Sequence, residues 1–165
     1  MRRILLLALV VTLGCGAAAC GEPDRQVSSS DRAALDQFAD GVRQWRREGT
    51  EPWNKALAAG NMKLSQVAPE AEANMKKAIA KMDAAARAVS EPNVRAALER
   101  MVGTYRAKLA SVHKVDTAGY SLATLKEGLN DLKADGTATL KAWNAYVKQA
   151  KEAWNANPLA GLNVG

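Results

Sequence analysis

Cysteine and histidine are scarce in this chain of 165 residues. Both cysteines, Cys15 and Cys20, lie within the first twenty residues, so the remainder has no internal disulfide and no thiol chemistry. His113 is the only histidine. A metal site needs three or four converging ligands, and Ser-His-Asp or Cys-His catalysis would need this one histidine beside a nucleophile. We therefore expect His113 to neutralise the C-terminal end of its helix rather than to react.

Motifs of catalysis are absent as well. There is no Gly-x-Ser-x-Gly turn and no phosphate-binding Gly-Lys-Ser/Thr sequence. The nearest carboxylate pairs, Glu70/Glu72 and Asp131/Asp135, lie at positions that predict solvent exposure, whereas catalytic carboxylates are tuned by burial. We predict that the protein is not an enzyme and holds no metal or cofactor. An enzyme would require His113 or a carboxylate pair to be buried in a cleft.

The N-terminus carries the most specific signal. Met1-Arg2-Arg3 gives a short positive start, and residues 4–13 form an apolar run of about ten residues, the length of a secretory signal core and too short to span a membrane. Small residues follow from Gly14 to Ala19, before Cys20 and a polar stretch. This order of segments is typical of an export signal with a cleavage site.

The segment resembles the lipobox signals of bacterial lipoproteins, in which a small residue precedes a cysteine that is diacylated and becomes the mature N-terminus. The resemblance covers about an eighth of the chain and implies a signal peptide over 1–19, lipidation of Cys20, and an extracytoplasmic address at the cell membrane. Cys15 is the alternative, although it leaves only about fourteen residues of signal. Simple secretion and an uncleaved anchor are further alternatives.

The composition of the mature part predicts an all-α protein. About 145 residues suffice for one domain with a sizeable core. Alanine, leucine, lysine and glutamate are abundant, while aromatic residues make up only 5%. Without Arg2 and Arg3 the net charge falls from +6 to about +4, which is far below the clustered positive field of a nucleic-acid binder. We expect no nucleic-acid partner.

Apolar residues recur at spacings of three and four along most of the mature chain, which predicts an antiparallel bundle of about four helices over 31–155. Residues 20–30 are predicted to be the lipidated cysteine and a polar tether with a reach of roughly 17–19 Å. Residues 156–165 are predicted to be a flexible tail.

Local signals predict where the helices begin and end. Ser30 and Ser121 are expected to cap the first and last helices, and Ser90 to cap a helix that has Pro92 in its first turn. Gly49 is expected to stop the first helix, and the next long helix to begin near Pro69. A kink or break at Gly136 is equally compatible with the sequence as a continuous last helix.

The last helix carries an apolar register that predicts its buried face: Leu122, Leu125, Leu129, Leu132, Leu140, Trp143, Val147, Ala150 and Trp154. Four lysines recur every seven or eight residues along one side: Lys126, Lys133, Lys141 and Lys148. These lysines fit either contact with anionic lipid headgroups or wall polymers, or an ordinary solvated face.

Tryptophan and methionine add two further alternatives. Trp45 and Trp143 fit the core, whereas Trp53 and Trp154 either cap the ends of the core or rim a pocket for a partner. Three methionines lie on apolar stripes and are expected to be packing residues rather than haem ligands: Met75, Met82 and Met101.

Together these features predict a membrane-anchored lipoprotein that acts as a non-enzymatic binding or interaction module at the cell envelope. Its expected partners are the membrane, reached through the lipid anchor, and an envelope protein, a wall polymer or anionic lipid headgroups. The alternative is a carrier that holds a small hydrophobic ligand or lipid between its helices, in a cavity lined by Met75, Met82, Met101 and the leucines.

Overall fold

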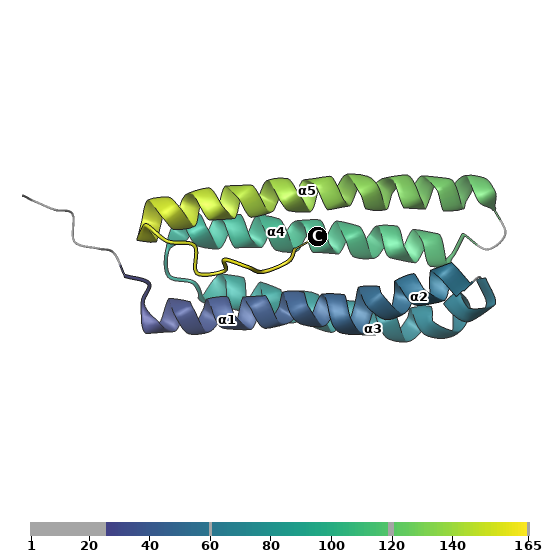
Figure 1. Ribbon diagram of the computed structural model, residues 1–165, viewed down its shortest axis with the longest axis horizontal. Helices are drawn as coiled ribbons and strands as arrows, with labels where there is room; N and C mark the ends of the chain where they lie inside the picture. The colour runs from purple at the N-terminus through teal and green to yellow at the C-terminus, as the bar shows by residue number, and fades with distance from the viewer. Residues whose placement is uncertain (1–25, 60, 119–120, 165) are drawn as a thin grey trace, which may run out of the picture.

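Four helical rods run alternately up and down one long axis in the computed structural model, which describes residues 26–59, 61–118 and 121–164 (Figure 1). The first rod joins α1 (Ser29–Gln44), the π-helical segment η1 (Trp45–Thr50) and α2 (Glu51–Ala59). The others are α3 (Asn61–Ala88), α4 (Pro92–Asp116) and α5 (Leu122–Trp154). The predicted antiparallel all-α bundle is confirmed.

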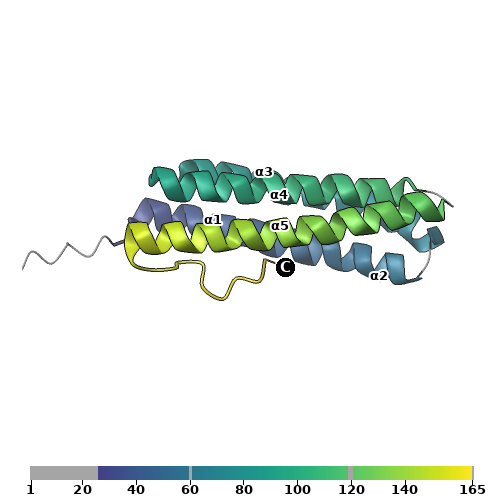
Figure 2. The same ribbon diagram turned by 90° about the horizontal axis from the view of Figure 1, so that it is seen from above.

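The rods pack in chain order rather than as a closed square. Among the described elements, the backbone of α1 approaches α3, α3 approaches α4, and α5 approaches α4 alone. The C-terminal segment, residues 155–164, returns along the bundle beside α1 and α5 (Figures 1 and 2). It covers part of the seam between α1 and α5, two described helices whose backbones do not approach each other.

The core lies mainly between α1, α3 and α4. Phe38, Met75 and Met101 are completely buried there, and Trp45 meets the ring of Tyr105 edge-on at 5.1 Å between centroids. Full burial of such a side chain contributes about 1.5–3 kcal/mol to folding. The narrow apolar stripes of these three helices therefore supply most of the stability.

Two glycines bring the first rod close to α3. A Cβ at Gly41 would lie 2.5 Å from Cγ of Met82, and a Cβ at Gly49 would lie 2.5 Å from Cγ of Met75. The prediction that Gly49 stops the first helix is wrong, because the chain passes it in the wider turn of η1 and continues into α2. The contact with Met75 outweighs the low helix propensity of glycine here.

The start of α3 also differs from the sequence prediction. Pro69 lies inside α3, which begins at Asn61 instead of near the proline. Leu64 and Ala68, the residues that extend the helix backwards, are both buried. Burial of these residues therefore outweighs the backbone hydrogen bond that a proline removes.

A buried carboxylate near the start of α1 binds the connection between α3 and α4. Asp31, 3% exposed, accepts hydrogen bonds from the Ser90 backbone N–H at 2.6 Å and from the Ser90 hydroxyl at 2.7 Å. Ser90 therefore does not cap α4, whose N-cap is Glu91. Ser28 rather than Ser30 caps α1, accepting from the Asp31 N–H. Ser121 caps α5 as predicted.

The end of the chain differs from the predicted flexible tail. Asn155, in the left-handed conformation, ends α5, which runs through Gly136 without a break. Leu159 and Val164 then enter the buried core, and the Tyr105 hydroxyl donates to the Val164 carbonyl at 3.4 Å. Burial of these apolar side chains in the open seam is favourable because it removes their surface from water.

The glycine contacts predict opposite effects of the same substitution. Gly41→Ala should lower the free energy of unfolding by about 1 kcal/mol, because overpacking against Met82 exceeds the gain in helix propensity. Gly136→Ala meets no atom within 4 Å and should raise it by about 0.5–1 kcal/mol. Urea unfolding of both variants measures the difference; equal shifts would contradict the close packing of α1 on α3.

The Asp31 contact predicts a pH-dependent loss. Burial by itself would raise the pKa of Asp31, but the hydrogen bonds from Ser90 outweigh burial and hold it below 3.8. Asp31→Ala should therefore cost about 2 kcal/mol at pH 7. The cost should shrink as pH falls below about 4 and the carboxylate protonates. Urea unfolding from pH 7 to pH 2, with exposed Asp36→Ala as control, tests this; a cost independent of pH would contradict it.

Candidate functional site

The outer face of α5 carries apolar side chains that no other element covers. Leu122 is 80% exposed, Leu140 52% and Leu129 42%. The sequence assigned all three to the buried face, and that assignment is wrong. The side of α5 that packs on α4 instead presents small or polar residues such as Gly128 and Thr139, together with Tyr146.

Close contact with α4 decides which side of α5 is buried. A Cβ at Gly128 would lie 2.7 Å from Cγ2 of Val115, so only glycine fits the present spacing. The hydroxyl of the completely buried Thr139 lies 2.8 Å from the Asp135 carbonyl, to which it donates, and 3.1 Å from the Thr104 hydroxyl of α4. At 100° per residue, the three leucines lie roughly a quarter turn from this contact side.

The charged residues of α5 are divided between the side that packs on α4 and the outer face that carries the leucines. Glu127 and Asp131 both pair with Lys114 of α4, at 2.7 and 3.1 Å, and Asp135 accepts from the Ser111 hydroxyl at 2.7 Å. The lysines predicted to line the helix are all exposed: Lys126, Lys133, Lys141 and Lys148. Over residues 122–141, the outer side of α5 is thus apolar and basic, and the acidic residues of this stretch engage α4.

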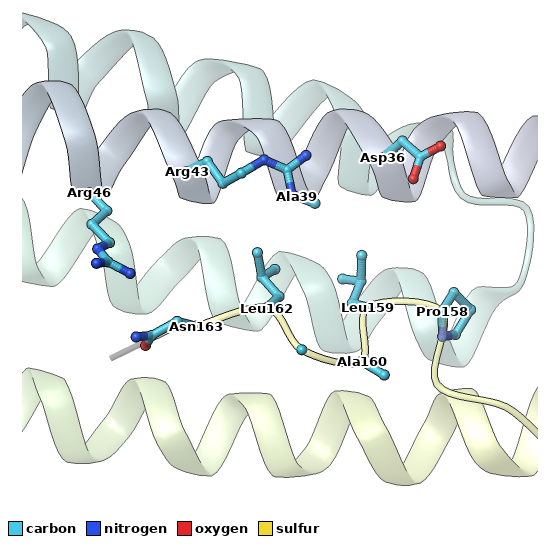
Figure 3. A pocket seen from close by; sticks show the side chains of 10 residues that line it. Asp36, Ala39, Arg43, Arg46, Pro158, Leu159, Ala160, Leu162 and Asn163 are labelled. Atoms are coloured by element: carbon cyan, nitrogen blue, oxygen red, sulfur yellow. The ribbon is translucent and has the colours of Figure 1, made fainter.

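A surface groove of about 410 Å³ lies between α1 and the C-terminal segment (Figure 3). Leu159 and Leu162 point from the segment toward α1, Arg43 lies along α1, and Arg46 of η1 extends toward the segment. Arg43 pairs with Asp40 and Arg46 with Glu51 at 3.0 Å. Because nearby carboxylates balance both guanidinium groups, the groove has little net charge to attract an ionic ligand.

A polar cluster joins α2, α3 and α4 near the end of the bundle. The Trp53 indole N–H donates to Asp116 Oδ1 at 2.6 Å, and Nδ1 of His113 lies 3.1 Å from Oε1 of Glu72. Burial, together with the neighbouring Glu72 carboxylate, raises the pKa of Asp116 to about 6, although the bond from Trp53 opposes the shift. Among the described carboxyl groups, Asp116 has the most strongly shifted pKa.

Of the residues that the sequence analysis considered for catalysis, only His113 and Glu72 belong to this cluster. His113 lies in the last turn of α4, as predicted, and its side chain is 63% exposed. Glu70 is exposed, but Glu72 is only 13% exposed, since it packs between α3 and α4. Asp116 was not predicted as a candidate, because its contacts with Trp53 and Glu72 join residues far apart in the sequence. In the described ranges, no three His, Cys, Asp or Glu side chains are arranged to hold a metal ion.

The tryptophans are distributed through the core instead of gathering at one concavity. Trp45 and Trp53 are both 4% exposed and Trp154 is 9% exposed. Trp143 is half-buried beside Tyr146, with 5.3 Å between ring centroids. Of the two alternatives for Trp53 and Trp154, their burial favours capping the ends of the core.

Cys20 and Cys15 lie outside the described residues, as does the whole predicted signal peptide. None of the described helices combines the length and apolar content that crossing a bilayer demands. No family model, curated protein or solved structure matches the chain.

The raised pKa of Asp116 predicts a stabilising substitution. A carboxyl whose pKa is higher in the folded state than in the unfolded state destabilises the fold as pH rises through that interval, here from about 4 to about 6. Asp116→Asn keeps an acceptor for Trp53 and removes the ionisation. Relative to the native chain, its free energy of unfolding should therefore increase between pH 4 and pH 7, on the order of 1 kcal/mol after screening.

Urea unfolding at the two pH values measures the change for Asp116→Asn, with Asp36→Asn as the exposed control. A difference between variant and native chain that stays constant from pH 4 to pH 7 would show that Asp116 titrates normally.

Proposed function

We propose that this chain is an exported lipoprotein, anchored at the cell membrane through Cys20, that works as a non-enzymatic interaction module at the cell envelope. The observation that carries the interaction role is the exposed row of leucines on α5. Exposed apolar side chains that lie together on one face mark surfaces that bind a partner or a membrane.

The geometry at the start of α1 is compatible with an anchor. Ser28 caps α1, so eight residue steps separate it from Cys20, and even fully extended they reach only about 26–29 Å. A lipidated Cys20 would hold the bundle within that distance of the bilayer. Two acyl chains give stable attachment, whereas one gives only marginal and reversible binding.

The carrier alternative receives less support from the packing. Met75, Met82 and Met101, which were expected to line its cavity, are all completely buried, and the first two press against Gly49 and Gly41. The groove of about 410 Å³ lies elsewhere, beneath the C-terminal segment, and is lined by Ala39, Leu159 and Leu162 among others. This groove is open at the surface and does not include the three methionines.

Substitution of each cysteine in turn tests the anchor. Cys20→Ser should remove the acylation site. The protein should then be lost from the membrane fraction of the native host's cells. Cys15→Ser, the matched control, should leave it membrane-bound, because that residue is removed with the signal. Mass spectrometry of the mature N-terminus identifies the acylated residue. Membrane retention of Cys20→Ser with an unmodified N-terminus would overturn the proposal.

A further inference from the structure

We infer that the outer face of α5, over residues 122–141, docks on an anionic lipid surface. The inference deepens the proposed function, since it depends on a membrane-anchored bundle and names the partner of its exposed leucines. Two observations carry it: the alignment of the leucines and the separation of charges around α5. The length of chain between the proposed anchor and the fold is compatible with it.

The leucines form a straight row. At 100° per residue, Leu122, Leu129 and Leu140 point within about 20° of one another, and at 1.5 Å per residue the row is about 27 Å long. All three side chains are more than two-fifths exposed. A row of this length along one side of a rod lets the side chains enter a flat surface together.

Lysines accompany this row, and acidic residues do not. Lys126 and Lys133 lie within roughly 40° of the row, and Lys141 flanks it about a quarter turn away. None of the three lysines forms an ion pair within the described part of the chain. The three acidic residues of the same stretch engage α4 instead, as described above: Glu127, Asp131 and Asp135.

This combination fits a lipid surface better than a protein groove or a wall polymer. Helices that lie in the membrane interface present leucines toward the acyl chains and lysines toward the headgroups. Anionic headgroups attract each lysine close to the surface. A purely protein partner would be expected to cover the leucines without needing three unpaired cations around them.

The proposed anchor is compatible with this contact only when the bundle lies along the bilayer, because α1 begins at the end of the bundle where α5 ends and residues 122–141 lie toward the opposite end (Figure 1). The stretch from Cys20 to Ser28 extends to at most about 29 Å, and each helix with its side chains is about 10–12 Å across. A bundle two helices deep can therefore lie along the membrane with α5 against it while Cys20 stays inserted. The acyl anchor and the α5 face would then hold the molecule at two points.

The test uses the full lipidated chain in vesicles of phosphatidylcholine alone or with about 30% phosphatidylglycerol. An environment-sensitive fluorophore is attached at Leu129→Cys, and a control fluorophore at the exposed Ala80→Cys of α3. Quenching by a spin-labelled lipid reports contact with the bilayer, and flotation of the vesicles reports the anchor separately. We expect strong quenching at position 129 in the anionic vesicles only, and weak quenching at position 80 in both.

Charge reversal provides the matched comparison. Combining Lys126→Glu, Lys133→Glu and Lys141→Glu should reduce quenching at position 129 to the level of position 80 while the protein still floats with the vesicles. Reversing three exposed cations on other helices changes the net charge equally and should leave the quenching unchanged: Arg32→Glu, Lys55→Glu and Arg100→Glu.

Two results would overturn the inference. One is equal quenching at positions 129 and 80 in anionic vesicles. The other is a label at position 129 that is shielded in both vesicle types and more so at higher protein density, which would show that a second copy of the chain covers the leucines. Failure to float with phosphatidylcholine vesicles would instead contradict the acyl anchor, whatever the quenching at position 129.

Discussion

The one-sided contact between α5 and α4 determines which side chains of α5 are buried and which face the solvent. Gly128 lets the backbone of α5 approach Val115 so closely that a methyl group would not fit between them, and Thr139 adds a buried hydrogen bond to Thr104. This contact fixes the rotation of α5 about its own axis. Because that rotation turns Gly128 and Thr139 inward, it turns Leu129 outward.

The open side of the bundle follows from the same contact. Since α5 approaches only α4 among the described helices, a seam remains between α5 and α1. The C-terminal segment fills part of this seam with Leu159 and Val164, both buried. The extended segment thus replaces a fourth helix-to-helix interface, and it leaves the half of α5 that begins at Leu122 with an exposed outer face.

The sequence was sufficient to predict an antiparallel all-α bundle, because the spacing of apolar residues in α3 and α4 matches the faces that these helices bury. It misplaced Pro69 and Gly49 because each is accommodated by a tertiary contact that local propensity does not include. The prediction that the leucines of α5 are buried was wrong for a different reason. Leucines at helical spacing show that a helix has an apolar side, but not which neighbour covers it, and small residues at the α4 contact gave only a weak signal.

The candidate site, like the fold, was only partly predictable from the sequence. The lysines of α5 were identifiable from their spacing, and their exposure is compatible with both predicted roles, contact with anionic groups and a solvated face. Their separation from Glu127 and Asp131 was not, because it depends on where Lys114 of α4 lies. The perturbed carboxyl of Asp116 likewise arises from Trp53 and Glu72, which are distant in the sequence.

The most direct test of the outward-facing α5 is hydroxyl-radical footprinting of the lipidated chain on vesicles, with oxidation of single leucines measured by mass spectrometry. The account predicts that Leu122, Leu129 and Leu140 are oxidised readily on zwitterionic vesicles and protected on anionic ones, while the buried Leu98 is protected on both. Equal protection of the three exposed leucines and Leu98 on zwitterionic vesicles would contradict it.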